Sequence, residues 1–455
     1  MQDFTLLVAA QREYFFSQAT KPYEFRVKQL RLLQQWIGHN EAAILRALNE
    51  DLGKSPYEGY LTEVCMVKQE LKDALRHLKS WMRPRHAKTA IGQFPGRCRI
   101  YSEPYGVTLI MSPWNYPFQL TIAPLIGAVC AGNCAVIKPS AYSPATSALV
   151  ACMAQELFPA EYVAVVQGGR QENAGLLEQA FDFIFFTGSP SVGRLVMEKA
   201  SAHLTPVSLE LGGKSPVIVD ETADIALTAR RLAWGKYLNA GQTCVAPDYV
   251  LVHQSREQQL VEALVAEIRR MYSSAPLASP DLPKIINQRH FERLVGLLGS
   301  GVISHGGQID PSARKIAPTV LTDVTWDSPI MQEEIFGPIL PILTYRKLDE
   351  AICRVQQRPK PLALYLFTRS KQTEEKVLRE VSFGGGCVND TVLHLATSYM
   401  PFGGVGESGM GGYHGKASYD TFSHQKSILK RMAKPDVSLR YAPFEDKMKL
   451  LKKLM

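Results

Sequence analysis

Short apolar runs alternate with longer amphipathic stretches along most of this chain. From residue 20 to about residue 83, apolar side chains recur every three to four positions among charged ones, which predicts helices. Between residues 106 and 186 the apolar runs are short and continuous, and stretches long enough for a helix separate them: GVTLIM, CAVIKP, YVAVVQG and FDFIFFTG. Buried parallel strands joined by helical crossovers are the simplest explanation of this alternation. The pattern therefore predicts a nucleotide-binding α/β domain with a parallel sheet.

A second alternation of this kind begins near residue 207 and predicts another open α/β sheet. Its apolar runs are VSLELGGKSPVIVD, YVLVHQS, ALYLFT and GGCVND. Before the first sheet, RCRIYSEPYGV has the composition of an edge strand that leaves the helical layer. The late run HQKSILKR is suited to pair with it, and an exposed strand edge usually finds a partner. These two segments predict a small β layer outside the two sheets.

Size and charge narrow the classes of function. A chain of 455 residues exceeds the usual size of one domain, and its 46% hydrophobic and 21% charged residues are ordinary for a globular protein. The net charge of +8 is scattered, and no zinc finger or RNP-like motif accompanies it, which argues against nucleic acid as a partner. No window approaches the roughly 20 apolar residues of a membrane span. The N-terminal MQDFTLLVAAQREYFF lacks a basic region and a cleavage site, so secretion is not expected.

The C-terminal segment DKMKLLKKLM is basic and amphipathic. Such a segment permits contact with a membrane surface. A helix that docks its Leu and Met face on its own protein is the preferred interpretation.

The eight cysteines point to a reducing compartment. They are irregularly spaced and include no C-x-x-C pair, so a disulfide framework is not expected and the cytoplasm fits best. Cys130 and Cys134 have no matching His or Cys pair, and we interpret them as buried hydrophobic residues, not as metal ligands.

Cys244 stands in NAGQTCVAPDY, between a flexible Gly-Gln-Thr turn and a proline. A free cysteine is usually buried filler, but filler seldom stands in a tight turn with backbone N–H groups at hand. A thiolate at this place would be a strong nucleophile toward a carbonyl carbon. No histidine stands nearby in the sequence, which weakens a papain-like interpretation.

Three motifs carry polar groups that could act beside such a thiol. SPWNYPFQL holds Asn115 between two prolines, where its amide could meet negative charge on an oxygen or make an Asx turn. SLELGGKSP places Glu210 at the end of an apolar run, where burial would raise its pKa toward neutrality. MQEEIFGPIL holds Glu333 and Glu334, and a solvated surface role is the simpler interpretation of either one alone.

Two predicted strand ends carry features that could hold a nucleotide. In FFTGSPSVGRL, Gly188 to Gly193 could bring backbone N–H groups to a phosphate, but the motif is neither a P-loop nor G-x-G-x-x-G and an ordinary turn is the default. VIKPSAYSP places Lys138 at a strand end, where it could hold ribose hydroxyls or a phosphate, or close the strand in solvent. Sheets of this class bind ligands at the carboxyl edge, and these residues are expected there: Trp114, Asn115, Lys138, Gly168 and Gly188.

Eight dispersed motifs resemble the aldehyde dehydrogenase superfamily in their order and intervals: SPWNYP, IKPS, FTGSPSVG, LELGGKSP, GQTC, EEIFGP, GGCVND and PFGGVGESGMGGYHG. The resemblance runs from about Glu103 to Gln425, and the chain is most similar to the class 3 branch. It implies an α/β fold with a Rossmann-like cofactor domain, a second open α/β catalytic domain and a small β bridging element for oligomerisation. The implied division is residues 1–84 and 105–209 for the dinucleotide-binding domain, 210–391 for the catalytic domain, 85–104 and 392–432 for the bridging element, and 433–455 for the C-terminal tail.

The resemblance also implies roles for individual residues. Cys244 becomes the nucleophile, with Asn115 and the Cys244 backbone N–H as the oxyanion hole. Glu210 becomes the general base, while Glu334 matches the position that holds the nicotinamide-side ribose and that in this branch has also been considered as a base. Lys138 would bind the adenosine ribose. The other implied cofactor-binding residues are Trp114, Ser140, Ala141, Gly188, Ser189, Val192, Gly193, Glu210, Leu211, Gly212, Glu334 and Phe336.

The implied reaction is the oxidation of an aldehyde to a carboxylic acid with NAD(P)+ and without a metal ion. Thiolate attack gives a thiohemiacetal, a hydride leaves for NAD(P)+, and water activated by a carboxylate hydrolyses the thioester. Many relatives carry Glu three residues after the lysine, where it would repel a 2′-phosphate. This chain has Ala141 there, so both NAD and NADP are expected as cofactors. The alternatives are a CoA-acylating dehydrogenase and a catalytically idle binding or structural member of the fold.

The resemblance extends to substrate and assembly. Class 3 relatives suggest a hydrophobic tunnel for medium- or long-chain aliphatic or aromatic aldehydes, and a cytoplasmic homodimer. Plain core packing explains the candidate tunnel residues equally well: Trp114, Tyr116, Trp234, Tyr237 and Leu393.

Overall fold

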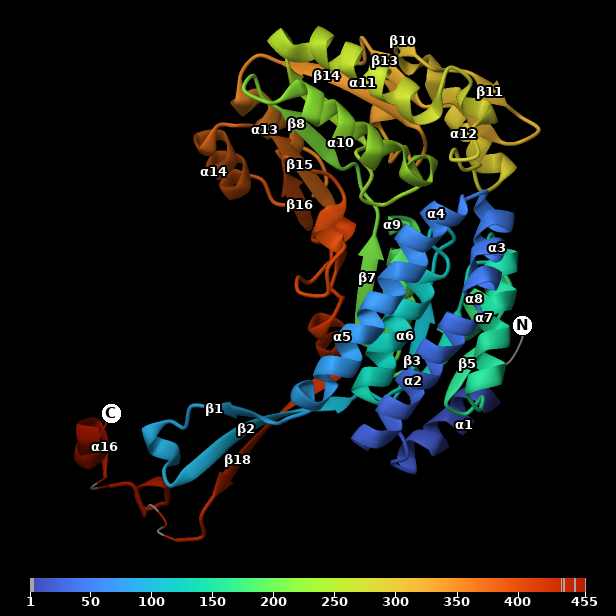
Figure 1. The fold of residues 1–455 in the computed structure, drawn as a ribbon. Coiled ribbons are helices and arrows are strands. Elements are labelled where there is room, and N and C mark those ends of the chain that lie inside the picture. The colour runs from blue at the N-terminus through green and yellow to red at the C-terminus, as the bar shows by residue number, and fades with distance from the viewer. Residues whose placement is uncertain (1–3, 435, 437, 446, 455) are drawn as a thin grey trace.

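Three parts are visible in the computed structural model, which describes residues 4–434, 436, 438–445 and 447–454 (Figure 1). Helices of the N-terminal half surround one sheet, green to orange elements form a second α/β part beside it, and a β arm extends away from both. The α/β fold with two open sheets and a small β element is therefore as expected from the sequence.

The first sheet has six strands in the order β17-β7-β6-β3-β4-β5. All neighbouring pairs are parallel except β17 with β7, which confirms the parallel strands predicted from the apolar runs. The strands are β3 (Val107–Met111), β4 (Cys134–Lys138), β5 (Val163–Val165), β6 (Phe183–Gly188), β7 (Val207–Leu211) and β17 (Gly409–Met410). Since the strand order reverses between β3 and β6, a crevice at their carboxyl ends is the expected ligand site.

The strand β7 belongs to the first sheet, whereas the sequence pattern placed it in the second. We expected the second α/β run to begin near residue 207, but β7 pairs with β6, with Glu210 opposite Thr187. The second run therefore begins only at β8. An apolar strand pattern shows that a segment is buried, but not which sheet takes it up.

Helices pack around the first sheet, and the predicted helical start is confirmed. It also includes a helix that precedes residue 20. The central helix α6 is buried along its whole length, in keeping with a sequence that is apolar on every face. The helices are α1 (Thr5–Phe16), α2 (Tyr23–His39), α3 (Glu41–Leu52), α4 (Pro56–Gly59), a π-helical turn (Tyr60–Val64), α5 (Cys65–Trp81), α6 (Gln119–Ala131), α7 (Pro144–Leu157), α8 (Arg170–Leu177) and α9 (Pro190–Ser201).

The second sheet has seven strands in the order β10-β13-β14-β9-β8-β15-β16, of which only β10 pairs antiparallel. Its strands are β8 (Pro216–Val219), β9 (Tyr249–His253), β10 (Val302–His305), β13 (Thr319–Thr322), β14 (Ile339–Tyr345), β15 (Ala363–Phe367) and β16 (Gly385–Val388). A small hairpin joins β11 (Ile309–Asp310) to β12 (Lys315–Ile316). The helices are α10 (Ile225–Tyr237), α11 (Glu257–Tyr272), α12 (Gln288–Leu297), α13 (Leu348–Gln356) and α14 (Lys371–Glu380).

The β arm confirms one prediction and corrects another. It consists of β1 (Arg85–Ala87), β2 (Gly96–Pro104) and β18 (Ser423–Arg431), and β18 follows the short helix α15 (Lys416–Thr421). β2 and β18 pair antiparallel along their whole length, as the two sequence runs predicted. The prediction that residues 97–103 form an edge strand is wrong, because β1 pairs with the other side of β2.

The end of the chain does not dock as expected. The last helix, α16 (Met448–Leu454), lies beyond the arm, away from both α/β parts (Figure 1). Leu450 is 50% and Leu451 44% exposed, so the prediction that this face packs on the chain's own body is wrong. Among the described residues, every helix is too short or too polar to cross a bilayer.

Candidate active site

A strained loop presents Cys244. It follows α10, and the consecutive residues Asn239, Ala240 and Gly241 all have positive φ angles of 52°, 52° and 74°. Two of them are not glycine, and such backbone geometry concentrates at functional sites. The Gln242 side chain closes the loop, since its Nε2 donates to Asn239 O at 3.0 Å and its Oε1 accepts from Ile286 N at 3.0 Å. The tight turn predicted around Cys244 is therefore present.

The Cys244 thiol is free and half-buried, and two carboxyl groups lie near it. Burial raises the pKa of Cys244 to about 12, and the carboxylates of Glu334 and Glu210 raise it further. The backbone N–H groups of Cys244 and Val245 oppose this shift of the pKa but do not overcome it. We expected a thiolate at this position. The structure shows instead that the thiol must lose its proton when it attacks.

Glu210 lies on β7 with its carboxylate in a dry environment. The residue is 3% exposed, and in the described chain neither carboxylate oxygen has a hydrogen-bond partner. Burial raises the pKa of Glu210 well above its ordinary value of 4.5. A carboxyl group of this kind is suited to take up a proton from water near neutral pH.

Glu334 lies in the loop between β13 and β14, and it is the less exposed member of the adjacent pair. The neighbouring Glu333 has a side chain that is 53% exposed and pairs with Arg293 at 3.0 Å. Burial and the nearby Asp248 raise the pKa of Glu334 to about 8, and within the described residues its Oε1 has no hydrogen-bond partner. The Glu334 carboxylate lies against Gly212, so a Cβ atom at Gly212 would displace that carboxylate.

Asn115 is oriented by the loop that carries Cys244. Its Nδ2 donates to Gln242 O at 3.0 Å, which uses one of the two amide protons and leaves the second for another acceptor. Asn115 is 3% exposed and follows β3 at the carboxyl edge of the first sheet. This placement is compatible with an amide that meets an oxyanion on Cys244.

Lys138 ends β4 at the same edge. The residue is 3% exposed, and its Nζ donates to Pro139 O at 2.8 Å and to Gly168 O at 2.6 Å. Burial lowers the pKa of Lys138 to about 8. A lysine that only closes a strand in solvent is thereby excluded. In the following turn, the Ser140 hydroxyl accepts from Tyr142 N at 3.2 Å, and Ala141 is exposed.

The strand-to-helix turn after β6 has the features of a phosphate site. Gly188 ends the strand, and Ser189 is the N-cap of α9 but makes no capping hydrogen bond with its side chain. The first N–H groups of a twelve-residue helix thus point to a place where an anion fits. Gly193 allows α9 to approach Leu211 closely, because a Cβ there would meet the leucine side chain at 2.6 Å, and Val192 is 38% exposed beside it. The residues present fit a bound dinucleotide.

Two aromatic residues lie between the two α/β parts of this site. The rings of Trp114 and Phe336 meet edge to face with centroids 5.3 Å apart, and Trp114 also contacts His290. Phe336 has φ +50°, a left-handed geometry that few aromatic residues adopt. Trp114 therefore links the loop after β3 to the loop that carries Glu334 and Phe336.

The candidate tunnel residues other than Trp114 lie in different environments. Tyr116 is buried with its hydroxyl 2.6 Å from Thr243 Oγ1, directly beside the Cys244 turn. Trp234 is half-buried on α10, and Leu393 is 50% exposed. Tyr237 is fully buried, and its hydroxyl donates to Thr319 O, so it belongs to the core.

Several residues of the site were missed by sequence reasoning. Tyr365 lies beside Cys244, since its hydroxyl donates to Val245 O at 2.6 Å. Burial raises the pKa of Tyr413, and the nearby Glu210 and Cys244 add to this shift. Asp248 accepts from Ile335 N at 2.9 Å and pairs with Lys214 at 2.5 Å, which anchors the Glu334 loop. Only the contiguity of Gln242 with Cys244 offered a sequence signal. The others come from distant segments whose meeting depends on the fold.

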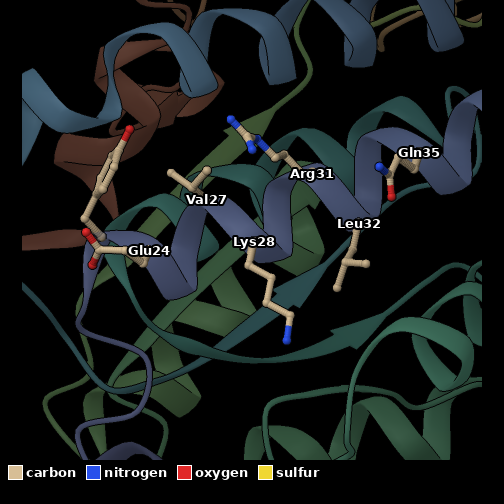
Figure 2. Close-up of a pocket in the computed structure, with 7 residues that line it drawn as sticks. Glu24, Val27, Lys28, Arg31, Leu32 and Gln35 are labelled. Carbon is tan, nitrogen blue, oxygen red and sulfur yellow. The ribbon is translucent and has the colours of Figure 1, made fainter.

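The groove along α2 is not part of this site. One helix face supplies all of its lining, and the side chains in Figure 2 project from that face without converging on a common point. Its lining residues are Tyr23, Glu24, Val27, Lys28, Arg31, Leu32 and Gln35.

Comparisons with known proteins agree with this geometry. Residues 2–428 match the aldehyde dehydrogenase family. The 4,4'-diaponeurosporen-aldehyde dehydrogenase of Staphylococcus aureus is 48% identical over 443 residues, which cover 97% of this chain and 96% of that protein. Human aldehyde dehydrogenase family 3 member B1 is 49% identical over 435 residues, which cover 95% of this chain and 93% of that protein. The substrate-bound structure of Staphylococcus aureus AldH matches with a TM-score of 0.98 at 47% identity, over 100% of this chain and 99% of that one. The chain therefore belongs to the aldehyde dehydrogenase family, is similar to its class 3 members, and is an NAD(P)-dependent aldehyde dehydrogenase.

Proposed function

We propose that Cys244 is the nucleophile that oxidises aldehydes to carboxylic acids through a thioester. The observation that carries this proposal is the Cys244 thiol, held by a strained turn beside Asn115 and close to two carboxyl groups of raised pKa. A nucleophile, an amide donor and a base candidate thus meet at one place, as covalent catalysis at a carbonyl requires.

The first step joins the thiol to the substrate. Cys244 Sγ forms a bond to the aldehyde carbon while its proton passes to a neighbouring carboxylate. The aldehyde oxygen becomes an oxyanion, which Asn115 Nδ2 and the Cys244 backbone N–H stabilise. Removal of such a donor commonly costs about 3 kcal/mol of transition-state stabilisation.

The second half of the reaction releases the acid. A bound NAD(P)+ would supply the acceptor for the hydride that the former aldehyde carbon loses, which leaves a thioester on Cys244. Glu210 then takes a proton from water as the water attacks the thioester carbon, the C–S bond breaks, and Cys244 regains its proton. A carboxylate placed to activate water favours hydrolysis over transfer to CoA.

The residues proposed to hold the cofactor lie at the carboxyl edge of the first sheet and, in the second α/β part, in the loop between β13 and β14. Lys138 and Ser140 serve the adenosine ribose, while Glu334 and Phe336 serve the nicotinamide side, with Trp114 and Gly212 packed beside them. The pyrophosphate would be held by the turn after β6 and its neighbours, namely Gly188, Ser189, Val192, Gly193 and Leu211.

Ala141 is expected to permit use of NADP+ as well as NAD+. Replacing it by glutamate would place a carboxylate in the exposed turn after Lys138, where it would repel a 2′-phosphate. Ala141→Glu is expected to lower kcat/KM for NADP+ by at least about 10-fold and to leave that for NAD+ nearly unchanged. Ala141→Gln is the matched control without charge. An unchanged cofactor ratio in the glutamate variant, or no turnover of the wild type with saturating NADP+, contradicts this assignment.

We propose medium- or long-chain aliphatic and aromatic aldehydes as substrates. Tyr116 is an aromatic residue beside the Cys244 turn, Trp234 is half-buried on α10, and the Staphylococcus aureus relative is named for 4,4'-diaponeurosporen-aldehyde. A panel of aldehydes of increasing chain length, assayed with both cofactors and with and without CoA, tests the proposal. Free acid as the product in both conditions supports it. A CoA thioester, or a preference for the shortest aldehydes, counts against it.

A homodimer is the proposed assembly. The β arm extends from the body, and large apolar side chains of the arm and tail are exposed: Ile91, Phe94, Ile428, Leu429 and Met432. An exposed patch of this kind marks an interface more often than open surface. Light scattering at micromolar concentration is expected to give twice the mass of the chain, and the mass of one chain would contradict the proposal.

We also propose that the three parts act as a dinucleotide-binding domain, a catalytic domain and a bridging element with the boundaries given above, and that the protein works in the cytoplasm. All eight cysteines are free, which is compatible with a reducing compartment.

A further inference from the structure

A buried ion pair lies directly beneath the Asn115 loop. Lys54, between α3 and α4, pairs with Glu63 of the π-helical turn at 2.6 Å, and both side chains are fully buried. Isolated charges are costly to bury, so each needs its partners. Glu63 Oε2 accepts from the backbone N–H of Phe118 at 2.8 Å and of Gln119 at 3.2 Å, at the N-terminus of α6. This half of the pair thus caps a central helix.

The other half of the pair reaches the oxyanion-hole residue. Lys54 Nζ donates to the main-chain carbonyl of Asn115 at 2.9 Å and lies 4.0 Å from the centre of the Tyr116 ring. The same carbonyl accepts a second bond from Asn239 Nδ2 at 2.8 Å. Asn239 N in turn donates to Glu58 Oε1 at 2.7 Å. Charged groups of residues 54–63 therefore hold both the Asn115 loop and the turn that presents Cys244.

We propose that Lys54 is a positioning residue of the reaction, which holds the Asn115 backbone so that its side-chain amide faces the oxyanion on Cys244. The inference rests on the proposed function, because it gives Asn115 that role. The amide side chain is attached to the backbone that Lys54 and Asn239 fix from opposite segments. Loss of the Lys54 donor lets this backbone shift, and misplacement of a reacting group by about 1 Å can cost about 100-fold in rate.

Two variants that break the same ion pair separate positioning from stability. Lys54→Met removes the donor to Asn115 O, whereas Glu63→Gln keeps it. Both are expected to lower Tm, since each leaves one buried charge without its partner. Only Lys54→Met is expected to lower kcat, by about 10- to 100-fold, with the KM values for aldehyde and cofactor nearly unchanged. Cleavage of an activated phenyl ester by Cys244 needs the same oxyanion contact without cofactor, and it should fall in parallel.

Two further variants keep the test decisive if Lys54→Met does not fold. The double variant Lys54→Met/Glu63→Gln buries no unpaired charge and should regain Tm but not kcat. Asn239→Gly keeps the left-handed backbone and the N–H bonded to Glu58 but removes the second donor, and it should also lower kcat. A wild-type kcat in any folded variant that lacks a donor, or an equal loss of kcat in Glu63→Gln, overturns the proposal. Activity of the wild type and its loss in Cys244→Ala test the proposed function separately.

Discussion

Cys244→Ala is expected to abolish formation of NAD(P)H from aldehydes, with a loss of about 10⁴-fold or more in kcat. Without sulfur no thiohemiacetal forms, and the aldehyde carbon remains a poor hydride donor. Methyl in place of thiol removes little volume from a half-buried position, so Tm should change little. The measurement is absorbance of the reduced nicotinamide at saturating aldehyde and cofactor.

Cys353→Ala is the matched control for this loss. Cys353 is exposed on α13, in the second α/β part and outside the turn that carries Cys244. The control should retain wild-type kcat. Residual turnover of Cys244→Ala above a few per cent, or a comparable loss in the control, would show that another group is the nucleophile.

Glu210→Gln is expected to stall the enzyme after hydride transfer. The first turnover should still give a burst of NAD(P)H close to one equivalent per active site, because the thiol and the amide of Asn115 are intact. Hydrolysis of the thioester should slow by about 10²- to 10⁴-fold, the range that a general base contributes. Rapid mixing measures the burst, and acid quenching followed by mass spectrometry should trap acyl-Cys244.

The pH profile adds a second readout to the Glu210 prediction. Only the carboxylate form accepts a proton, and burial raises the pKa of Glu210 above 4.5. The hydrolysis rate of the wild type should therefore rise with pH through that raised pKa, and Glu210→Gln should lose this rise. Glu334→Gln is the matched comparison, since the pKa of Glu334 is also raised by burial, to about 8. If Glu334→Gln, and not Glu210→Gln, accumulates acyl-enzyme, the two carboxylates have exchanged roles.

Local signals in the chain were sufficient to predict the parallel strands of the first sheet and part of the second, whereas β10, β13 and β14 were not predicted. Parallel strands buried on both faces are continuous apolar runs, so β3, β4 and β6 could be read directly. Cys244, Asn115 and Glu210 stand in motifs where turn residues follow predicted strands or helices. Each motif consists of residues that are adjacent in the chain, so it can be recognised without knowledge of the fold.

Contacts between distant segments could not be read in the same way. Lys54, Glu58 and Glu63 look like ordinary charged residues of an amphipathic helical stretch, yet all three are buried. Their burial depends on two loops that lie far along the chain. The predictions for β7 and α16 were wrong for the same reason. A periodic pattern of apolar residues shows which face of an element is apolar, but not which other element covers that face.

The sequence by itself determined the α/β fold and the enzyme class of this protein, and it predicted a nucleophilic cysteine, two acidic candidates and a dinucleotide-binding edge, because local pattern and motif order encode those features. Only the tertiary structure decided how the pKa values of these groups shift and which distant residues hold them in place. The pKa values of Cys244, Glu210 and Glu334 rise because the fold removes water from all three, and the carboxyl groups near the sulfur raise the pKa of Cys244 further. Desolvation and electrostatic interaction depend on distance in space, which the order of residues does not specify.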